Sequence, residues 1–207
     1  MEIAMPFFSL LAAASLAAPG YSIKLNDYPD KALEMGKSAA ILADVVVDPK
    51  GKLVRCEKLD TFGDAELADE ICKIYETKRH EPAHFANGEP AWFMERDVYR
   101  MFIPGTPTRT AIDTLRKPDA ILEVNALPPG METLDALVVI AIDEAGEVTD
   151  CGPDVGDEPS PVIQAVCANA DVVPHDVFTT PDGNAAPYVS RMRFRLQVAA
   201  APSDVAS

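Results

Sequence analysis

The spacing of apolar and polar side chains changes from segment to segment along the first half of the chain. An apolar, β-branched run is followed by a turn of Asp, Pro, Lys and Gly and then by a stretch with a period of two, a pattern typical of a β-hairpin. An amphipathic stretch then predicts a helix, and a long alternating stretch predicts a final strand. The predicted elements are strands at residues 38–47 and 53–59, a turn at 48–51, a helix from Thr61 or Asp64 to about Arg79, and a strand at 92–103.

The second half of the chain repeats this order of elements. Ser160 is a suitable cap and Pro161 a suitable first residue for a short helix. In the last strand, apolar residues alternate with Arg191, Arg193 and Arg195, so one face is apolar and the other is basic. The predicted elements are strands at residues 137–142 and 147–151, a turn at 143–146, a helix at 161–170 and a strand at 188–198.

The two halves are copies of one module, because matching residues are separated by a constant 95 positions. The pairs are Asp48/Asp143, Gly51/Gly146, Cys56/Cys151, Cys72/Cys167 and Gly88/Gly183. We therefore predict an α+β fold of two tandem small domains, each a strand-strand-helix-strand unit with an antiparallel sheet, one helix face and one disulfide. The predicted domains are residues 24–104 and 118–199, joined by a linker at 105–117 and followed by a flexible tail at 200–207.

Four cysteines occur in two pairs, each separated by sixteen positions. The duplication favours the bridges Cys56–Cys72 and Cys151–Cys167, each tying a strand to a helix. Buried free thiols in equivalent core positions are the alternative. A zinc site has less support, because no Cys-x-x-Cys knuckle is present and no histidine lies near a cysteine in the sequence.

The N-terminal residues 3–18 are apolar and end in small side chains, and Ser15-Leu16-Ala17 fits a small-x-small cleavage site. We expect a signal peptide at residues 1–18, cleaved after Ala17 or Ala18, and a periplasmic or secreted protein without a membrane span in its mature form. An uncleaved anchor is the alternative, although a span needs about 20 apolar residues and Pro6 interrupts this run.

The chain is strongly acidic, with 18 basic and 33 acidic residues and a net charge of −15. No lysine or arginine occurs between Lys117 and Arg191. A field of this sign repels phosphate backbones, so we expect no nucleic-acid partner. A solvated acidic face is the plain interpretation; a basic partner or loosely held divalent cations are the others.

Recognisable catalytic or metal-binding patterns are missing from the sequence. His80 and His84 flank Glu81, but Pro82 argues against a regular helix there, so we interpret these two and His175 as exposed loop residues. Paired cysteines leave no thiol nucleophile, and no Gly-x-Ser-x-Gly elbow occurs. We expect no cofactor, no metal, no enzymatic activity and no deep pocket with convergent polar groups.

The first copy resembles the TonB C-terminal domain, and residues 118–199 resemble a degenerate form of it. The matching segments are Tyr28-Pro29, the Asp48–Gly51 turn, the strand to Cys56, the helix through Cys72, Glu81-Pro82-Ala83, Asn87-Gly88-Glu89-Pro90 and the closing strand. Departures are Asp60-Thr61-Phe62-Gly63 in place of Ser-Ser-Gly, and His80 in place of the phenylalanine of Phe-x-Pro-Ala. Only about ten residues separate the apolar N-terminal run from Tyr28, too few to cross a periplasm at about 3.3 Å each.

The resemblance implies a non-enzymatic protein-binding module that pairs a peptide on a sheet edge, in an envelope or transport context. The partner would be a protein or peptide, such as an outer-membrane receptor or envelope protein. The side chains expected to contact it are Trp92, Glu95, Arg96, Arg100, Arg191, Arg193 and Arg195. The alternatives are a structural envelope-associated tandem domain without a peptide ligand and an enzyme with an unrecognised site. A structural tandem would bury both edges between its domains, whereas a peptide binder would leave one open.

Overall fold

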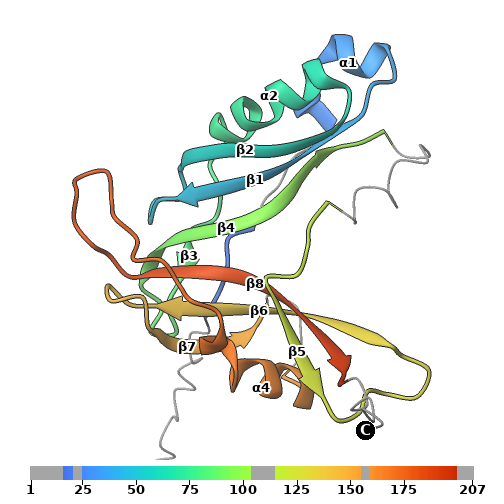
Figure 1. Cartoon of the computed structure of the whole chain (residues 1–207). Coiled ribbons are helices and arrows are strands. Elements are labelled where there is room, and N and C mark those ends of the chain that lie inside the picture. Colours follow the sequence, from blue (N-terminus) through green and yellow to red (C-terminus); the bar gives the residue numbers. More distant parts are fainter. Residues whose placement is uncertain (1–15, 21–24, 104–114, 155–158, 200–207) are drawn as a thin grey trace, which may run out of the picture.

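The computed structural model of the chain describes residues 16–20, 25–103, 115–154 and 159–199 (Figure 1). The elements are η1 Leu25–Asp27, α1 Asp30–Glu34, β1 Ala39–Val47, β2 Leu53–Gly63, α2 Ala65–Glu76, β3 Ala83–His84, β4 Pro90–Met101, β5 Ala120–Val124, β6 Thr133–Ile142, β7 Val148–Pro153, α4 Pro161–Cys167, η2 Ala170–Val172 and β8 Tyr188–Val198. The strands form one mixed eight-stranded sheet with the path β2-β1-β4-β8-β6-β7, in which β3 pairs with β4 and β5 pairs with β8. The expected tail lies outside the described residues, as do most of the expected linker and most of the expected signal peptide.

The first copy folds as its pattern predicts. Its strands β2, β1 and β4 are antiparallel neighbours. The Asp64 carboxylate caps α2 by accepting a hydrogen bond from the Leu67 N–H at 2.9 Å. Leu67 and Ile71 are fully buried against the strands, and burial of such a side chain is worth about 1.5–3 kcal/mol. The amphipathic pattern of this helix therefore identified the face that packs on the sheet.

The second copy repeats the arrangement with a smaller helix. Strands β8, β6 and β7 are antiparallel neighbours. The Ser160 hydroxyl caps α4 by accepting from the Ile163 N–H at 3.2 Å, and Pro161 occupies the first turn. Val166 is the one residue of this seven-residue helix that is buried. Less of this copy's core is supplied by its helix than in the first copy.

Both predicted disulfides are confirmed. Cys56–Cys72 ties β2 to α2, and Cys151–Cys167 ties β7 to α4. In the chain-entropy model a closed loop of this length stabilises the fold by about 3 kcal/mol. The short helix α4 is held on the sheet by Val166, by the half-buried Val162 and Ile163, and by the Cys151–Cys167 disulfide.

The histidines are placed differently from the prediction of exposed loops. His80 is buried, while His84 and His175 are half-buried. The His80 imidazole donates from Nε2 to the Tyr75 carbonyl at 3.0 Å. Ninety-five residues later, His175 makes the same contact with the Ala170 carbonyl at 3.2 Å. The shared offset of these pairs was present in the sequence, and it marks a structural contact after the helix rather than a metal site.

The two copies are joined by their equivalent last strands. Strands β4 and β8 pair in parallel through Trp92–Tyr188, Phe93–Val189 and Met94–Ser190, and lie side by side in the middle of the sheet (Figure 1). Parallel pairing of equivalent strands requires a half-turn about an axis along the strands, which inverts the faces of the sheet. The helices α2 and α4 must therefore cover opposite faces.

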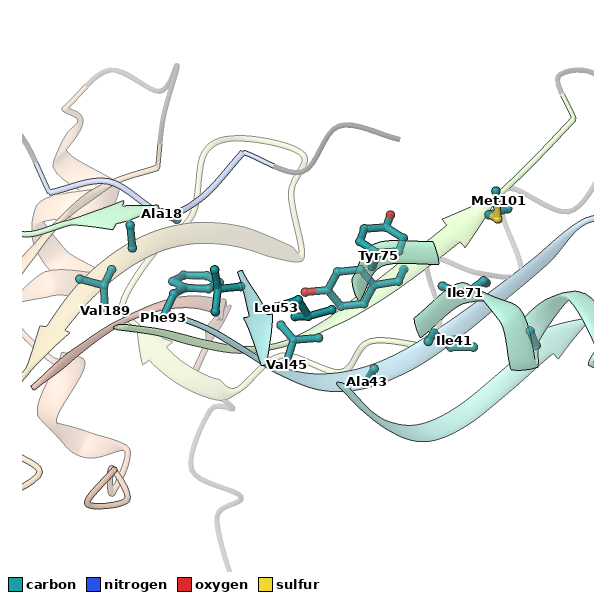
Figure 2. Packing of buried hydrophobic residues seen from close by; sticks show 14 of the residues in the cluster. Ala18, Ile41, Ala43, Val45, Leu53, Ile71, Tyr75, Phe93, Met101 and Val189 are labelled. Atoms are coloured by element: carbon teal, nitrogen blue, oxygen red, sulfur yellow. The ribbon is translucent and has the colours of Figure 1, made fainter. Parts of the chain in front are cut away.

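The two hydrophobic cores confirm this inversion. One core contains the α2 residues together with Phe93, and it also takes in Val139, Ala141 and Val189 from the second copy (Figure 2). The other core contains Val166 of α4 and takes in Val46, with Trp92 and Met94 packed against it, from the first copy. Each core thus uses residues of both copies. The two small domains that the sequence predicts are therefore packed together as one structure.

Candidate functional site

The site is built where the paired strands β4 and β8 diverge, a region that we call the seam. The two strands pair over three residues only. Beyond them, β8 continues with β5 as its neighbour from Phe194 to Val198, and among the described residues no strand lies against the second edge of β4 at Glu95–Val98. The two strands expected to bind a partner therefore bind each other first and then separate.

Glu95 and Arg191 meet at the seam, although 96 residues separate them in the sequence. The Glu95 side chain is 1% exposed, and its Oε2 lies 3.0 Å from Arg191 Nη1. Its Oε1 accepts a hydrogen bond from the Tyr99 hydroxyl at 2.7 Å. Arg191 Nε lies 2.8 Å from the Asp154 carboxylate. Burial, opposed by Arg191 and reinforced by the charge of Asp97, raises the pKa of Glu95 to about 7.

Arg116 fills the gap between the separating strands. Its guanidinium is almost fully buried and lies 3.1 Å from Asp97 of β4 and 3.0 Å from Asp119. The Asp119 carboxylate accepts the backbone N–H of Arg193 at 2.6 Å, and the Asp119 N–H donates to the Arg193 carbonyl at 2.7 Å. Arg116 therefore links β4 to β8 through side chains where their backbones no longer pair. No sequence pattern pointed to Arg116, because it stands in a stretch without hydrophobic periodicity.

The other predicted contact residues do not gather at the seam. Trp92 is half-buried, with its ring 5.2 Å from that of Phe178. Arg96 makes a two-point ion pair with Asp44 at 2.7 Å. The same type of pair joins Arg195 to Asp135 at 2.6 and 2.8 Å. Arg100 is exposed, and Arg193 is half-buried. Glu95 and Arg191 are therefore the two predicted contact residues that the fold brings together.

A hollow of about 780 Å³ opens beside the seam. Its floor is the face of the first copy's sheet that α2 does not cover, with Leu42, Leu59 and Met94, and its walls are residues 115–119 and 173–176. Glu95, Arg116 and Arg191 also line it. We expected no deep pocket with convergent polar groups; this hollow is open, and the sequence pattern did not predict it because it depends on the parallel pairing of β4 with β8.

Polar groups beside the hollow are already engaged with one another, and the cysteines are engaged in covalent bonds. Both oxygens of Glu95 already hold a donor, and all four cysteines are in disulfides. In the described part of the chain, no group of three or more His, Cys, Asp or Glu side chains could hold a metal ion. Burial of the carboxylate is the main cause of the raised pKa of Glu95, and its contacts with Arg191 and Tyr99 oppose that shift.

Several strand amides are occupied by neighbouring side chains. The backbone N–H groups of Thr61, Val98 and Cys151 each donate, at 2.7, 2.7 and 2.8 Å, to the carboxylate of the aspartate that precedes them. Thr61 lies on β2 and Cys151 on β7, the two ends of the sheet path. An amide bonded in this way is not available to an added strand, so these contacts reduce edge-to-edge pairing at three points.

Comparison with other proteins adds no assignment. No family model, curated protein or solved structure matches the chain significantly. Among the described residues, no helix is long and apolar enough to cross a membrane.

Proposed function

We propose that the protein is an exported, non-enzymatic protein-binding module in an envelope or transport context, and that a segment of its partner docks in the hollow beside the seam. The observation that carries this proposal is the position of the hollow, which opens where the two strands expected to bind a partner separate. The resemblance of residues 24–104 to TonB C-terminal domains supports binding of an extended polypeptide, with the difference that part of the β4 edge is here used by β8.

The lining of the hollow suits an extended polypeptide segment. Leu42, Leu59 and Met94 offer apolar contacts along its floor. The buried Arg116 guanidinium, held by Asp97 and Asp119, places a fixed positive charge in the wall of the hollow. Arg55 and Asp60 also line the hollow and are exposed, so they are available for charged side chains of the partner.

A structural role without a peptide ligand is the second candidate, and one observation favours it. The paired segments of β4 and β8 use each other's edges, and the strand amides of Thr61, Val98 and Cys151 are already bonded to aspartates. In this interpretation the hollow results only from the way in which β4 and β8 join the two copies, and it binds no ligand. The two candidates differ in whether the hollow contacts another protein.

Site-specific photo-crosslinking separates the two candidates. A benzophenone amino acid placed at Leu59, which is 42% exposed in the hollow, should give an adduct with an envelope protein when the chain is exported in its own cells. The matched control is Ile121, which is 55% exposed and lies outside the hollow. The adduct at Leu59 should weaken severalfold when Arg55→Glu and Asp60→Lys are added. No adduct at Leu59, or equal adducts at both positions, would favour the structural candidate.

A further inference from the structure

The segment Leu16–Gly20 is part of the folded protein, although the sequence pattern assigned its beginning to the signal peptide. Leu16 is 8% exposed and Ala18 is 6% exposed, and both belong to the core that contains Phe93 and Val189 (Figure 2). Ala17 pairs with His84 beside β3 through two backbone hydrogen bonds of 3.0 and 2.9 Å. The Pro19 carbonyl accepts a hydrogen bond from Arg191 Nη2 at 3.4 Å. This short segment therefore touches both copies of the repeat.

Cleavage after Ala17 or Ala18 would damage these contacts. A cut after Ala17 leaves a charged amine on Ala18, which is buried, and an unpaired buried charge is costly. A cut after Ala18 leaves a cationic amine on Pro19, close to the Arg191 guanidinium that contacts its carbonyl. Either cut removes Leu16 from the core and ends the pairing of Ala17 with His84.

We infer that the signal peptide is instead removed between Ala14 and Ser15, and that residues 16–20 stay in the mature protein as a tie between the two copies. Ala12-Ala13-Ala14 is a small-x-small sequence, and the apolar stretch of residues 3–11 before it is within the 7 to about 15 residues of a signal-peptide core. In this reaction a signal peptidase hydrolyses the Ala14–Ser15 peptide bond with water, which leaves a carboxylate on Ala14 and an amine on Ser15. The inference rests on export, which is part of the proposed function.

N-terminal sequencing of the exported chain tests the site of cleavage. The full chain, produced in a Gram-negative host and recovered from the periplasm, should begin at Ser15. Ala14→Leu should stop this processing, whereas the matched variant Ala17→Leu should leave the terminus at Ser15. A terminus at Ala18 or Pro19 would overturn the inference and leave export standing. A chain that keeps Met1 would overturn both.

Thermal unfolding tests the role of the tie independently of any peptidase. A chain produced to begin at Ser15 should unfold at a midpoint roughly 5–10 °C higher than one that begins at Pro19, because the longer chain keeps two buried side chains and two backbone hydrogen bonds. Equal midpoints would contradict the proposed tie between the copies.

Discussion

Glu95 is a buried carboxylate that holds an arginine from the other copy of the repeat. A single pair of this kind is weak evidence for stability, because desolvation of both charges offsets their attraction. Its position is more informative, since Glu95, Arg191 and Asp154 connect β4, β8 and the residue after β7 at one point. The network therefore favours one relative placement of the two copies.

The titration of Glu95 gives the seam a predictable pH dependence. Its pKa rises from 4.5 to about 7 on folding, so the folded state binds this proton more tightly than the unfolded state. The resulting stabilisation is fully present below pH 4.5 and is lost as the pH rises through 7. Relative to Glu95→Gln, the free energy of unfolding of the natural protein should fall by on the order of 2–3 kcal/mol between pH 4.5 and pH 8.

Urea unfolding of both proteins across this range measures the effect. The groups that face Glu95 are Tyr99 and Asp97 from its own strand, Arg191 from β8 and Arg116, and they are present in both proteins. His80, whose pKa is lowered by burial, is also common to both. Their contributions largely cancel in the difference between the two curves. A difference that does not change with pH would show that Glu95 does not titrate in this way.

At the scale of elements, the turn between β1 and β2 is fixed by its contact with the residues after α2. Gly51 has a φ of +77°, and its carbonyl accepts the His80 N–H at 2.8 Å. A Cβ atom at Gly51 would lie 1.9 Å from the His80 carbonyl oxygen. In the second copy, a Cβ at Gly146 would lie 2.8 Å from the His175 carbonyl oxygen. The repeated Asp-x-x-Gly motif is therefore a docking contact as well as a turn.

Alanine substitution should rank these turns by their contacts. Gly130 also has positive φ but has nothing within 4 Å of its Cβ position, so Gly130→Ala should cost only the backbone strain, about 1–2 kcal/mol. Gly146→Ala should cost more, and Gly51→Ala the most, because the backbone of residue 80 must move. Free energies of unfolding from urea titration measure the order. Equal losses at all three positions would contradict the contact.

The sequence predicted elements whose information is local. Strands β1 and β8, both caps and both disulfides follow from period, turn residues and the repeated spacing of sixteen. It missed β5, a five-residue strand that is held by parallel pairing with β8 rather than by a hairpin. It also missed the β4–β8 pairing, because contacts between strands 96 residues apart leave no periodic pattern. Arg116 was missed because it lies outside any periodic segment. At the candidate site, the sequence pattern therefore identified Glu95 and Arg191 as contact residues, but it did not predict that they pair with each other.

At the scale of the whole molecule, one parallel pairing determines the architecture. It inverts the second copy relative to the first, places α2 and α4 on opposite faces, and lets each core take residues from both copies. The hollow and the tie formed by residues 16–20 both depend on it, since both lie at the seam. The duplicated modules are thus parts of one sheet rather than independent units on a linker.

Backbone nuclear Overhauser contacts between residues 92–94 and residues 188–190, measured on the oxidised chain that begins at Ser15, test this pairing most directly. The structure predicts contacts in a parallel pattern across Trp92–Tyr188, Phe93–Val189 and Met94–Ser190. Antiparallel contacts within each copy together with none between β4 and β8 would contradict it, and with it the single sheet on which the seam and the hollow depend.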